Sequence, residues 1–366
     1  MSLKKQGKKK KVLVAISGGV DSAVAAKLLL DQSYNVSGVF LHFWKDDSGG
    51  GGENKCCSLE AQMDAKKICS QLGIKLYTLN FSKLFKKEVV DNFLNEYANG
   101  RTPNPCVVCN KKVKIGALLE WALALGFDYV ATGHYVKVEK VGGKYKMFKA
   151  RDRERDQSYF LYNFNQKQLT HLLFPLADYK KNQVRKMAEQ AGLLVAKKSD
   201  SQEICFISGK RHNDFLKKHL KLKEGDIYLQ EENRPIAKHQ GLPLYTIGQR
   251  RGIELGGTGP YYVSAFDYQK NILYVVKSFD DKSLYQKTMW VKDINWINEK
   301  DLKFPLTCQV VIRYHHRPVK CLVDYNKKEK KALVTFSTKQ RAVTLGQSVV
   351  FFIKDELLGG GLISEE

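Results

Sequence analysis

The chain has 366 residues, 43% of them hydrophobic, which is enough for two or three packed domains and excludes a globally disordered protein. Its 61 Lys and Arg against 38 Asp and Glu give a net charge of +23, which favours a nucleic-acid partner; a Lys-rich surface that only serves solubility is the alternative. No apolar run reaches the roughly 18–20 residues of a membrane span, the basic N-terminus has no signal-peptide cleavage site, and eight Cys are too few for a disulfide scaffold, so we expect a cytoplasmic protein.

The first half of the chain alternates short apolar strands with helices. Strands are predicted over 11–16, 35–41, 75–79 and 128–132, and helices over 23–30, 59–72, 83–97, 113–125 and about 181–192. Alternation of this kind builds a parallel sheet with helices on both faces, so the predicted class is α/β. Residues 49–52 are four consecutive Gly and predict a mobile surface loop.

After about residue 210 the pattern changes to short apolar-alternating segments separated by turn residues. These segments are 261–263, 271–276, 307–312, 320–323, 332–336 and 348–353. They predict antiparallel sheet. We therefore expect three domains: a catalytic α/β domain over 1–212, a small β-rich central domain over 213–282, and a C-terminal β-barrel over 283–366.

The hexapeptide Ser17-Gly18-Gly19-Val20-Asp21-Ser22 lies between the first predicted strand and the first predicted helix. Backbone N–H groups and the positive end of the helix dipole converge on an anion at such a junction, and Gly lets the backbone approach a phosphate closely. The loop lacks the Lys of a Walker loop. The hexapeptide in this context predicts a phosphate-binding loop, and an ordinary Gly-containing turn is the alternative.

Three Cys stand out by their surroundings. Cys106 and Cys109 follow two Pro that predict an extended backbone, and the run from Lys111 onward is predicted to be helical. A helix N-terminus and nearby Lys side chains favour a thiolate at Cys109. Cys205 lies in an apolar stretch, where a buried small residue is the alternative to a functional thiol. Core packing or surface exposure is expected for the remaining N-terminal Cys, which are Cys56, Cys57 and Cys69.

The loop resembles that of the PP-loop ATP pyrophosphatases, and longer segments resemble the tRNA-specific 2-thiouridylase family within them. These segments are 102–110 (TPNPCVVCN), 128–135 (DYVATGHY), 156–161 (DQSYFL), 200–207 (DSQEICFI), 247–252 (IGQRRG), 312–314 (IRY) and 346–347 (GQ). They cover nearly the whole chain and keep the family's order. The resemblance implies an adenine nucleotide α-hydrolase-like domain that binds ATP with Mg²⁺, and a C-terminal barrel that binds tRNA.

The resemblance also assigns individual positions. It implies that Cys109 is the nucleophile and that Cys205 carries the transferred sulfur as a persulfide. The implied ATP-contacting residues are Ala15, Ile16, Ser17, Gly18, Gly19, Val20, Asp21, Ser22, Leu41 and Gly133. The implied tRNA-contacting residues are Asn104, Pro105 and Cys106, which meet the target base, and His134, Asp156, Gln157, Arg313, Tyr314 and Gln347. The basic cluster around Arg313 and Tyr314 suits phosphate contact, and a solvated strand edge is the alternative.

Cys106 departs from the pattern, because many members carry Asp there. With Cys109 and Cys205 it could hold an iron–sulfur cluster with one open iron. A regulatory disulfide between Cys106 and Cys109, or a harmless substitution, are the alternatives.

The implied reaction is ATP-dependent 2-thiolation of the wobble uridine of tRNA, with the sulfur supplied by a persulfide donor or relay protein. The uridine is flipped out of its stack, its O2 is adenylated, and the Cys205 persulfide attacks C2 before Cys109 resolves the intermediate. A 2-thiocytidine-type enzyme and a non-catalytic tRNA-binding protein are the rival interpretations. The long β-rich C-terminus disfavours the first, and the intact loop with both Cys disfavours the second.

Overall fold

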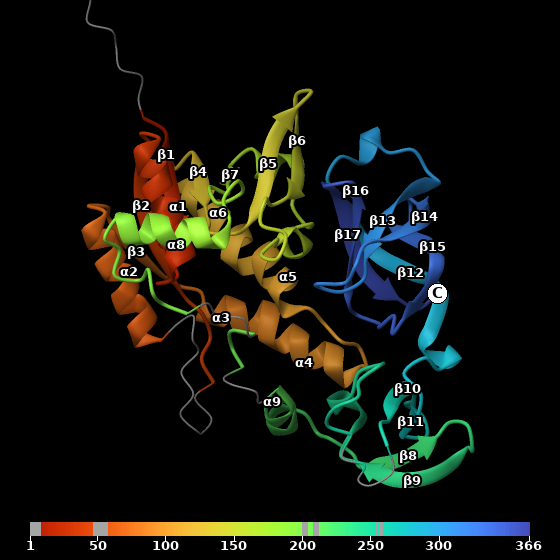
Figure 1. Ribbon diagram of the computed structural model, residues 1–366. Helices are drawn as coiled ribbons and strands as arrows, with labels where there is room; N and C mark the ends of the chain where they lie inside the picture. The colour runs from red at the N-terminus through yellow and green to blue at the C-terminus, as the bar shows by residue number, and fades with distance from the viewer. Residues whose placement is uncertain (1–8, 47–57, 200–203, 208–211, 254, 256–258) are drawn as a thin grey trace, which may run out of the picture. The chain divides into compact units, whose positions relative to one another are not determined.

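The computed structural model describes residues 9–46, 58–199, 204–207, 212–253, 255 and 259–366 (Figure 1). The chain forms two compact units. The first comprises 1–89, 106–209 and 355–357, and the second comprises 90–105, 210–354 and 358–366. The expected loop at 49–52, Cys56, Cys57 and the first four residues of the 200–207 segment lie outside the described residues.

A five-stranded parallel sheet forms the centre of the first unit, in the order β3-β2-β1-β4-β7. Its strands are β1 (Lys11–Ala15), β2 (Asn35–His42), β3 (Leu76–Asn80), β4 (Tyr129–Ala131) and β7 (Leu172–Leu173). Strand β1 lies in the middle and is almost wholly buried, as its unbroken apolar run requires. The predicted α/β class is confirmed for this part of the chain.

Helices α1 (Val20–Asp31), α2 (Leu59–Gln71) and α8 (Lys181–Gln190) share one continuous apolar core with β1 and β2. Four Ala in α1 and α2, at 23, 25, 26 and 65, are fully buried and allow close helix–sheet approach. Cys69 belongs to this core, as expected, and burial raises the pKa of its thiol to about 11. Helix α1 follows β1 after only four residues, so its N-terminus opens at the carboxyl edge of the sheet.

Two of the predicted helices contain π-helical turns that the sequence did not reveal. The expected helix 83–97 consists of α3 (Ser82–Phe85), the π-helix η1 (Lys86–Val90) and α4 (Asp91–Ala98). The expected helix 113–125 begins much earlier, with α5 (Pro105–Cys109), and continues through the π-helix η2 (Asn110–Ala117) into α6 (Leu118–Ala124). Such π-turns are rare and occur often at functional sites.

A β-hairpin, β5 (Val136–Val141) and β6 (Lys144–Lys149), follows β4 and was not predicted. Its strands carry charged residues at many positions, which hides the apolar alternation. The short elements η3 (Ser158–Phe160) and α7 (Gln166–Leu169) come next along the chain. Glu356 and Leu357 pair with β6 in the first unit.

The second unit contains a four-stranded sheet in the order β10-β11-β8-β9. Its strands are β8 (Gly225–Leu229), β9 (Arg234–His239), β10 (Tyr262–Asp267) and β11 (Ile272–Val276). The expectation of a purely antiparallel sheet was wrong, because β8 and β11 are parallel. The segment between them is long enough for the chain to return in the same direction. Helix α9 (His212–His219) precedes this sheet and η4 (Leu242–Leu244) follows β9.

The remaining strands of the second unit form a closed six-stranded antiparallel barrel, ordered β12-β15-β14-β13-β16-β17, with β17 pairing back to β12. They are β12 (Tyr285–Trp296), β13 (Leu306–Val311), β14 (Val319–Asn326), β15 (Lys331–Arg341), β16 (Ser348–Ile353) and β17 (Glu356–Ser364), with the turns η5 (Lys282–Leu284) and η6 (Glu299–Asp301). Alternate residues of these strands fill the barrel interior. The predicted small β-rich part followed by a barrel is therefore confirmed.

Candidate active site

The loop 17–22 turns from β1 into α1 as predicted. Gly18 has φ +76°, and a Cβ there would lie 2.5 Å from the carbonyl oxygen of Ala61, so only Gly fits. Ser22 Oγ donates to the Gly19 carbonyl at 3.0 Å and accepts from the Ser17 N–H at 3.2 Å. These bonds hold the loop as a compact turn. Gly19 is the N-cap of α1 and brings no side chain to cap it, so the first N–H groups of the helix face outward from the turn.

Lys181 brings a positive charge to this loop from the start of α8. Its Nζ lies 2.7 Å from both carboxylate oxygens of Asp21, and its side chain is only 12% exposed. The hydroxyl of Tyr135 also donates to Asp21 Oδ1, at 2.8 Å. Asp152 accepts from the Lys181 N–H at 2.8 Å and so fixes the first residue of α8. Sequence reasoning missed Lys181; the absence of a Lys from the loop was the signal that could have prompted a search for one elsewhere.

Gly133 closes the other side of the loop. It follows β4, and a Cβ on it would lie 2.8 Å from the Asp21 carbonyl carbon and 2.9 Å from the Ser22 nitrogen. Backbone therefore passes backbone at this point, which explains why Gly is needed. Ala15 and Ile16, at the end of β1, and Leu41, near the end of β2, are buried. Since parallel strands end at the same edge, the predicted ATP-contacting residues share the carboxyl edge of this sheet.

Cys109 is not at a helix N-terminus, contrary to expectation. The helical stretch begins at Pro105, which suits the first helical position, so Cys109 ends α5 and Cys106 lies in the first turn. Cys106 is exposed and Cys109 is buried. The π-helix η2 follows at once, and a Cβ on its Gly116 would lie 2.1 Å from the Lys111 carbonyl oxygen. Gly116 therefore permits the wide turn that carries Cys109.

Cys205 lies in the described stretch 204–207 and is half-buried. The next residue, Phe206, is buried and packs edge-on against Phe85, with ring centroids 5.8 Å apart. Phe85 ends α3 and stacks on Phe43, which follows β2. These aromatic contacts fix the backbone beside Cys205 in the first unit.

The described residues contain no group of three or more His, Cys, Asp or Glu side chains that could hold a metal ion. Cys106, Cys109 and Cys205 thus do not form an iron–sulfur ligand set in this structure. The differing exposure of Cys106 and Cys109 agrees with this, because a shared cluster would draw both thiols to one point.

His134, Asp156 and Gln157 lie together around Tyr135. The Thr132 Oγ1 and His134 Nδ1 atoms are 2.7 Å apart, and burial, helped by the Lys114 charge, holds the pKa of His134 well below its usual value. Gln157 Oε1 accepts from the Tyr135 N–H at 3.0 Å. The Asp156 carboxylate accepts from Ser158 Oγ at 2.6 Å, and burial raises its pKa. The imidazole of His134 is therefore neutral near pH 7.

In the second unit, Gln347 lies against the segment that leads to Asn104 and Pro105. Its Nε2 donates to the Thr102 carbonyl at 3.1 Å. Arg313 is exposed, and its Nη1 donates to the Arg341 carbonyl at 3.3 Å. Tyr314 packs against His315, with ring centroids 3.9 Å apart. The sequence thus predicted two residues of one basic surface but not their neighbour Arg341.

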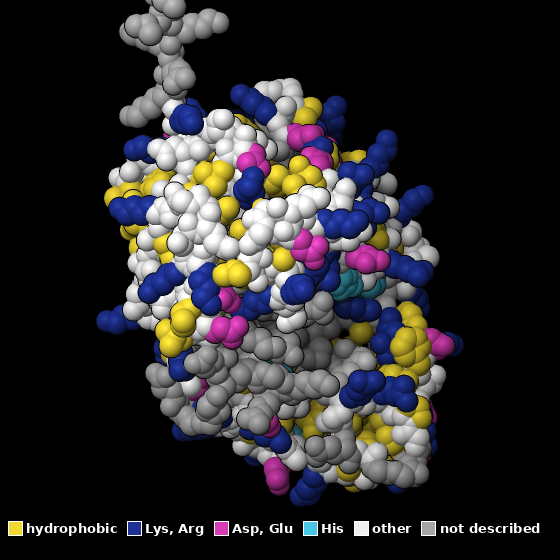
Figure 2. All heavy atoms as spheres, turned by 60° about the vertical axis from the view of Figure 1, so that its left-hand side comes forward, with side chains coloured by type: hydrophobic (Ala, Val, Ile, Leu, Met, Phe, Trp, Pro, Cys, Tyr) yellow, Lys and Arg dark blue, Asp and Glu magenta, His cyan; other side chains and the backbone are white. Residues whose placement is uncertain are grey.

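Lys and Arg side chains are spread over the face that Figure 2 shows, with fewer Asp and Glu side chains among them. This agrees with the net charge of +23. None of the helices in the described part of the chain is long and apolar enough to cross a membrane.

A parallel α/β sheet with a Gly-Gly loop at the N-terminus of its first helix defines a nucleotide-binding type of protein. Residues 10–209 match the family model of the tRNA methyl transferase HUP domain, 213–277 the tRNA methyl transferase PRC-barrel domain, and 286–363 the aminomethyltransferase beta-barrel domain.

Three curated relatives match along nearly their whole length. The tRNA-specific 2-thiouridylase MnmA of Buchnera aphidicola is 43% identical over 97% of this chain and 97% of its own. MnmA 2 of Clostridium tetani is 43% identical over 97% and 99%, and MnmA of Geobacillus thermodenitrificans is 42% identical over 97% and 95%. The chain belongs to the tRNA-specific 2-thiouridylase family.

Proposed function

We propose that this protein is an ATP-dependent enzyme that replaces O2 of the wobble uridine of tRNA with sulfur. The observation that carries the proposal is the loop at the start of α1, where Gly18 and Gly133 keep the backbone open and Lys181 brings a cation to Asp21. The names of the relatives support the same reaction.

The loop performs the activation half of the reaction. Its N–H groups and the dipole of α1 bind the phosphates of ATP, and the Ser17 and Ser22 hydroxyls add donors. Lys181 takes the place of the Lys that a Walker loop would carry. The uridine O2 attacks the α-phosphorus of ATP, the α–β phosphoanhydride bond breaks, and pyrophosphate leaves. Preorganised donors around the departing charge lower the barrier, because they need no reorganisation during the reaction.

Mg²⁺ fits this site through Asp21. The ion usually binds one or two carboxylates together with the substrate's phosphates, so a dedicated cluster of ligands is not required. Asp21 is partly exposed and lies at the start of α1, where the phosphates are expected. When bound, Mg²⁺ would neutralise phosphate charge.

Cys205 and Cys109 perform the sulfur-transfer half. The terminal sulfur of a Cys205 persulfide attacks C2 of the adenylated uridine, and AMP leaves with the bonding electrons of the C2–O bond. The Cys109 thiolate then attacks the Sγ of Cys205, which breaks the persulfide S–S bond and releases 2-thiouridine. A Cys109–Cys205 disulfide remains, and an external thiol reductant returns both residues to thiols. The sulfur reaches Cys205 from a persulfide donor or relay protein, and the site of action is the cytoplasm.

The tRNA is held by the residues that the resemblance assigns to it, namely Asn104, Pro105, Cys106, His134, Asp156, Gln157, Arg313, Tyr314 and Gln347. The neutral, buried His134 suits hydrogen bonding to an uncharged group better than phosphate contact. Arg313, which is exposed, suits a phosphate. The domains proposed for these tasks are 1–212 for catalysis, 213–282 as a central domain and 283–366 for tRNA binding.

Nucleoside mass spectrometry tests the proposal. Unmodified tRNA incubated with the protein, ATP and a persulfide donor should gain 2-thiouridine at the wobble position, and only when ATP is present. Cys205→Ser should abolish the product, whereas Cys69→Ala, a buried thiol of the same unit, should leave it unchanged. A thiocytidine or a methylated nucleoside instead would replace the proposed reaction with a rival one, and a tRNA complex without any modification would indicate a binding protein.

A further inference from the structure

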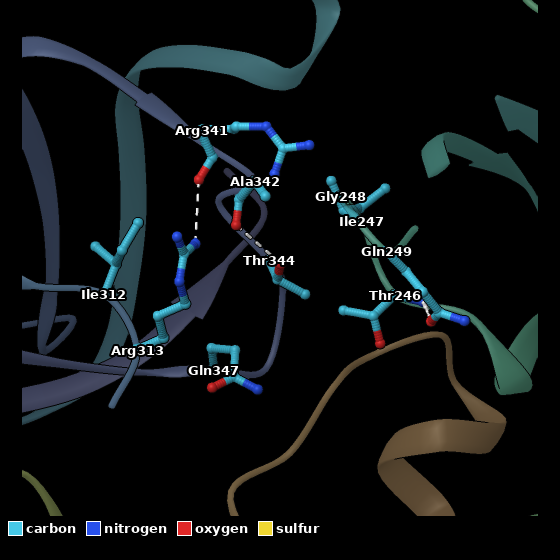
Figure 3. A pocket seen from close by; sticks show the side chains of 10 residues that line it. All are labelled: Thr246, Ile247, Gly248, Gln249, Ile312, Arg313, Arg341, Ala342, Thr344 and Gln347. Atoms are coloured by element: carbon cyan, nitrogen blue, oxygen red, sulfur yellow. Dashed lines mark hydrogen bonds between the residues drawn. The ribbon is translucent and has the colours of Figure 1, made fainter. Parts of the chain in front are cut away.

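A pocket in the second unit joins the small sheet to the barrel (Figure 3). Its volume is about 410 Å³, within the range of small-ligand sites. The segment after η4 contributes one wall, and the barrel contributes the other. The lining residues are Thr246, Ile247, Gly248, Gln249, Ile312, Arg313, Arg341, Ala342, Thr344 and Gln347.

Two guanidinium groups and no carboxylate line this pocket. Arg313 Nη1 donates to the backbone carbonyl of Arg341, so one Arg is held by the backbone of the other (Figure 3). Like charges at such a distance repel, and no acidic residue of the lining balances them. A bound anion would relieve this repulsion.

Arg341 is fixed in place before any ligand binds. Its Nε donates to the Phe279 carbonyl at 3.1 Å, and its guanidinium lies 4.0 Å from the centre of the Phe279 ring and 5.3 Å from that of Tyr262. Among the described residues, its Nη2 is buried and has no hydrogen-bond partner. A buried donor without a partner costs free energy, which a ligand oxygen could recover. The rigid aromatic seat also lowers the entropy lost on binding.

Gly248 keeps the pocket open beside Arg341. It has φ +80°, and a Cβ there would lie 2.7 Å from the Ala342 Cβ and 3.1 Å from Arg341 Nη1. Any larger residue would therefore fill the space next to the guanidinium. The neighbouring Gln249 is already held, since its Oε1 accepts from the Thr246 N–H at 3.0 Å. The wall opposite the two Arg side chains is thus formed by backbone and small polar groups.

The pocket is tied directly to the segment that precedes Asn104. The Thr102 N–H donates to the Leu345 carbonyl at 2.8 Å, and Gln347 Nε2 donates to the Thr102 carbonyl. The hydroxyls of Thr102 and Thr246 are 3.3 Å apart. Gly346 also packs on this segment, because a Cβ there would lie 2.8 Å from the Arg101 Cβ. Whatever binds in the pocket is therefore held close to the residues proposed to meet the target base.

We infer that this pocket binds a backbone phosphate of the tRNA close to the target uridine, with Arg341 and Arg313 as its ligands. The inference rests on the proposed function and adds Arg341 to the RNA-binding residues. A single phosphate fixed here would set the register of the strand while the neighbouring base enters the active site. Chemistry favours RNA over a free nucleotide, because the wall facing the two Arg side chains offers no aromatic ring for base stacking.

The test combines a protein variant with a neutralised phosphate. Binding of an unmodified tRNA anticodon stem-loop is measured for the wild type and for Arg341→Gln over a range of salt concentrations. We expect Kd to rise about 10-fold and the slope of log K against log salt to fall by about one in R341Q. Lys328→Gln, an exposed cation of the same unit outside the pocket, is the matched control and should change neither quantity appreciably.

Methylphosphonate scanning of the stem-loop then locates the phosphate. One neutral linkage next to the target uridine should weaken binding to the wild type but cause no further loss in R341Q. Equal losses in both proteins at every position would overturn the inference, as would tight competition by a mononucleotide at the same pocket. Because the scan also uses wild-type protein, a folding defect in R341Q cannot imitate either result. The wild type's formation of 2-thiouridine is measured in parallel, so failure of the proposed function is seen separately.

Discussion

Replacing Lys181 with Met removes the cation that the structure brings to the phosphate loop. The side chain is 12% exposed, and its Nζ lies 2.7 Å from both oxygens of Asp21, so it is fixed beside the start of α1. A hydrogen bond to a charged group contributes about 1.5–3 kcal/mol, which corresponds to a loss of about 10- to 150-fold in kcat/KM for ATP. Partial exposure of Asp21 places the expected loss toward the lower end of that range.

The assay is tRNA-dependent release of pyrophosphate at varied ATP concentration. Lys186→Met is the matched control, because Lys186 is an exposed residue of the same helix. Lys181→Arg keeps the charge and should recover part of the activity, which separates charge from packing. Thermal unfolding of each variant shows whether the loop is still folded. If Lys181→Met, still folded, used ATP as efficiently as Lys186→Met, the assignment of this cation to the phosphates would be refuted.

Three further predictions follow from the site. Cys109→Ser should retain tRNA-dependent pyrophosphate release but accumulate protein–tRNA adduct through Cys205, seen on a denaturing gel that lacks reductant; release of free thiolated tRNA at the wild-type rate would contradict its resolving role. Gly133→Ala would force a Cβ to within 2.8 Å of the loop backbone, so we expect ATP affinity to fall and the midpoint of unfolding to drop by the equivalent of about 1–3 kcal/mol, measured by calorimetry with and without ATP. Burial lowers the pKa of His134 from 6.5, so the unfolded chain binds the extra proton first and the contribution of His134 to stability is lost as pH falls below about 6.5; His134→Gln should flatten this part of the denaturation profile, by at most about 1.4 kcal/mol per pH unit, and an unchanged profile would argue against a neutral buried imidazole.

The parallel sheet and the phosphate loop were predictable because their signals are local. Strand β1 is an unbroken apolar run, and the loop that follows it must lie at a helix N-terminus whatever else the chain does. Gly133 was reached only through the resemblance. Its physical reason, the close passage of the backbone at Asp21, depends on two segments more than 100 residues apart in the sequence.

Lys181 and Arg341 were missed for the same reason. Lys181 is separated from Asp21 by 160 positions, and nothing in its own helix distinguishes it from the other Lys. Arg341 acquires its role from Phe279 and Gly248, which reach it through the tertiary fold. Pro105 was misjudged because Pro is compatible with both an extended segment and the first position of a helix. The π-turn after Cys109 follows from a backbone contact at Gly116 that no local pattern displays.

The most direct test of the central claim is a single turnover with a labelled sulfur. The protein is loaded with an isotopically labelled persulfide, freed of excess donor, and mixed with ATP and unmodified tRNA. The label should appear in 2-thiouridine at the wobble position, in an amount no greater than the protein, and Cys205→Ser should transfer none. Transfer of the label by Cys205→Ser, or its appearance in wild-type product without ATP, would contradict the claim that the loop activates the uridine and Cys205 delivers the sulfur.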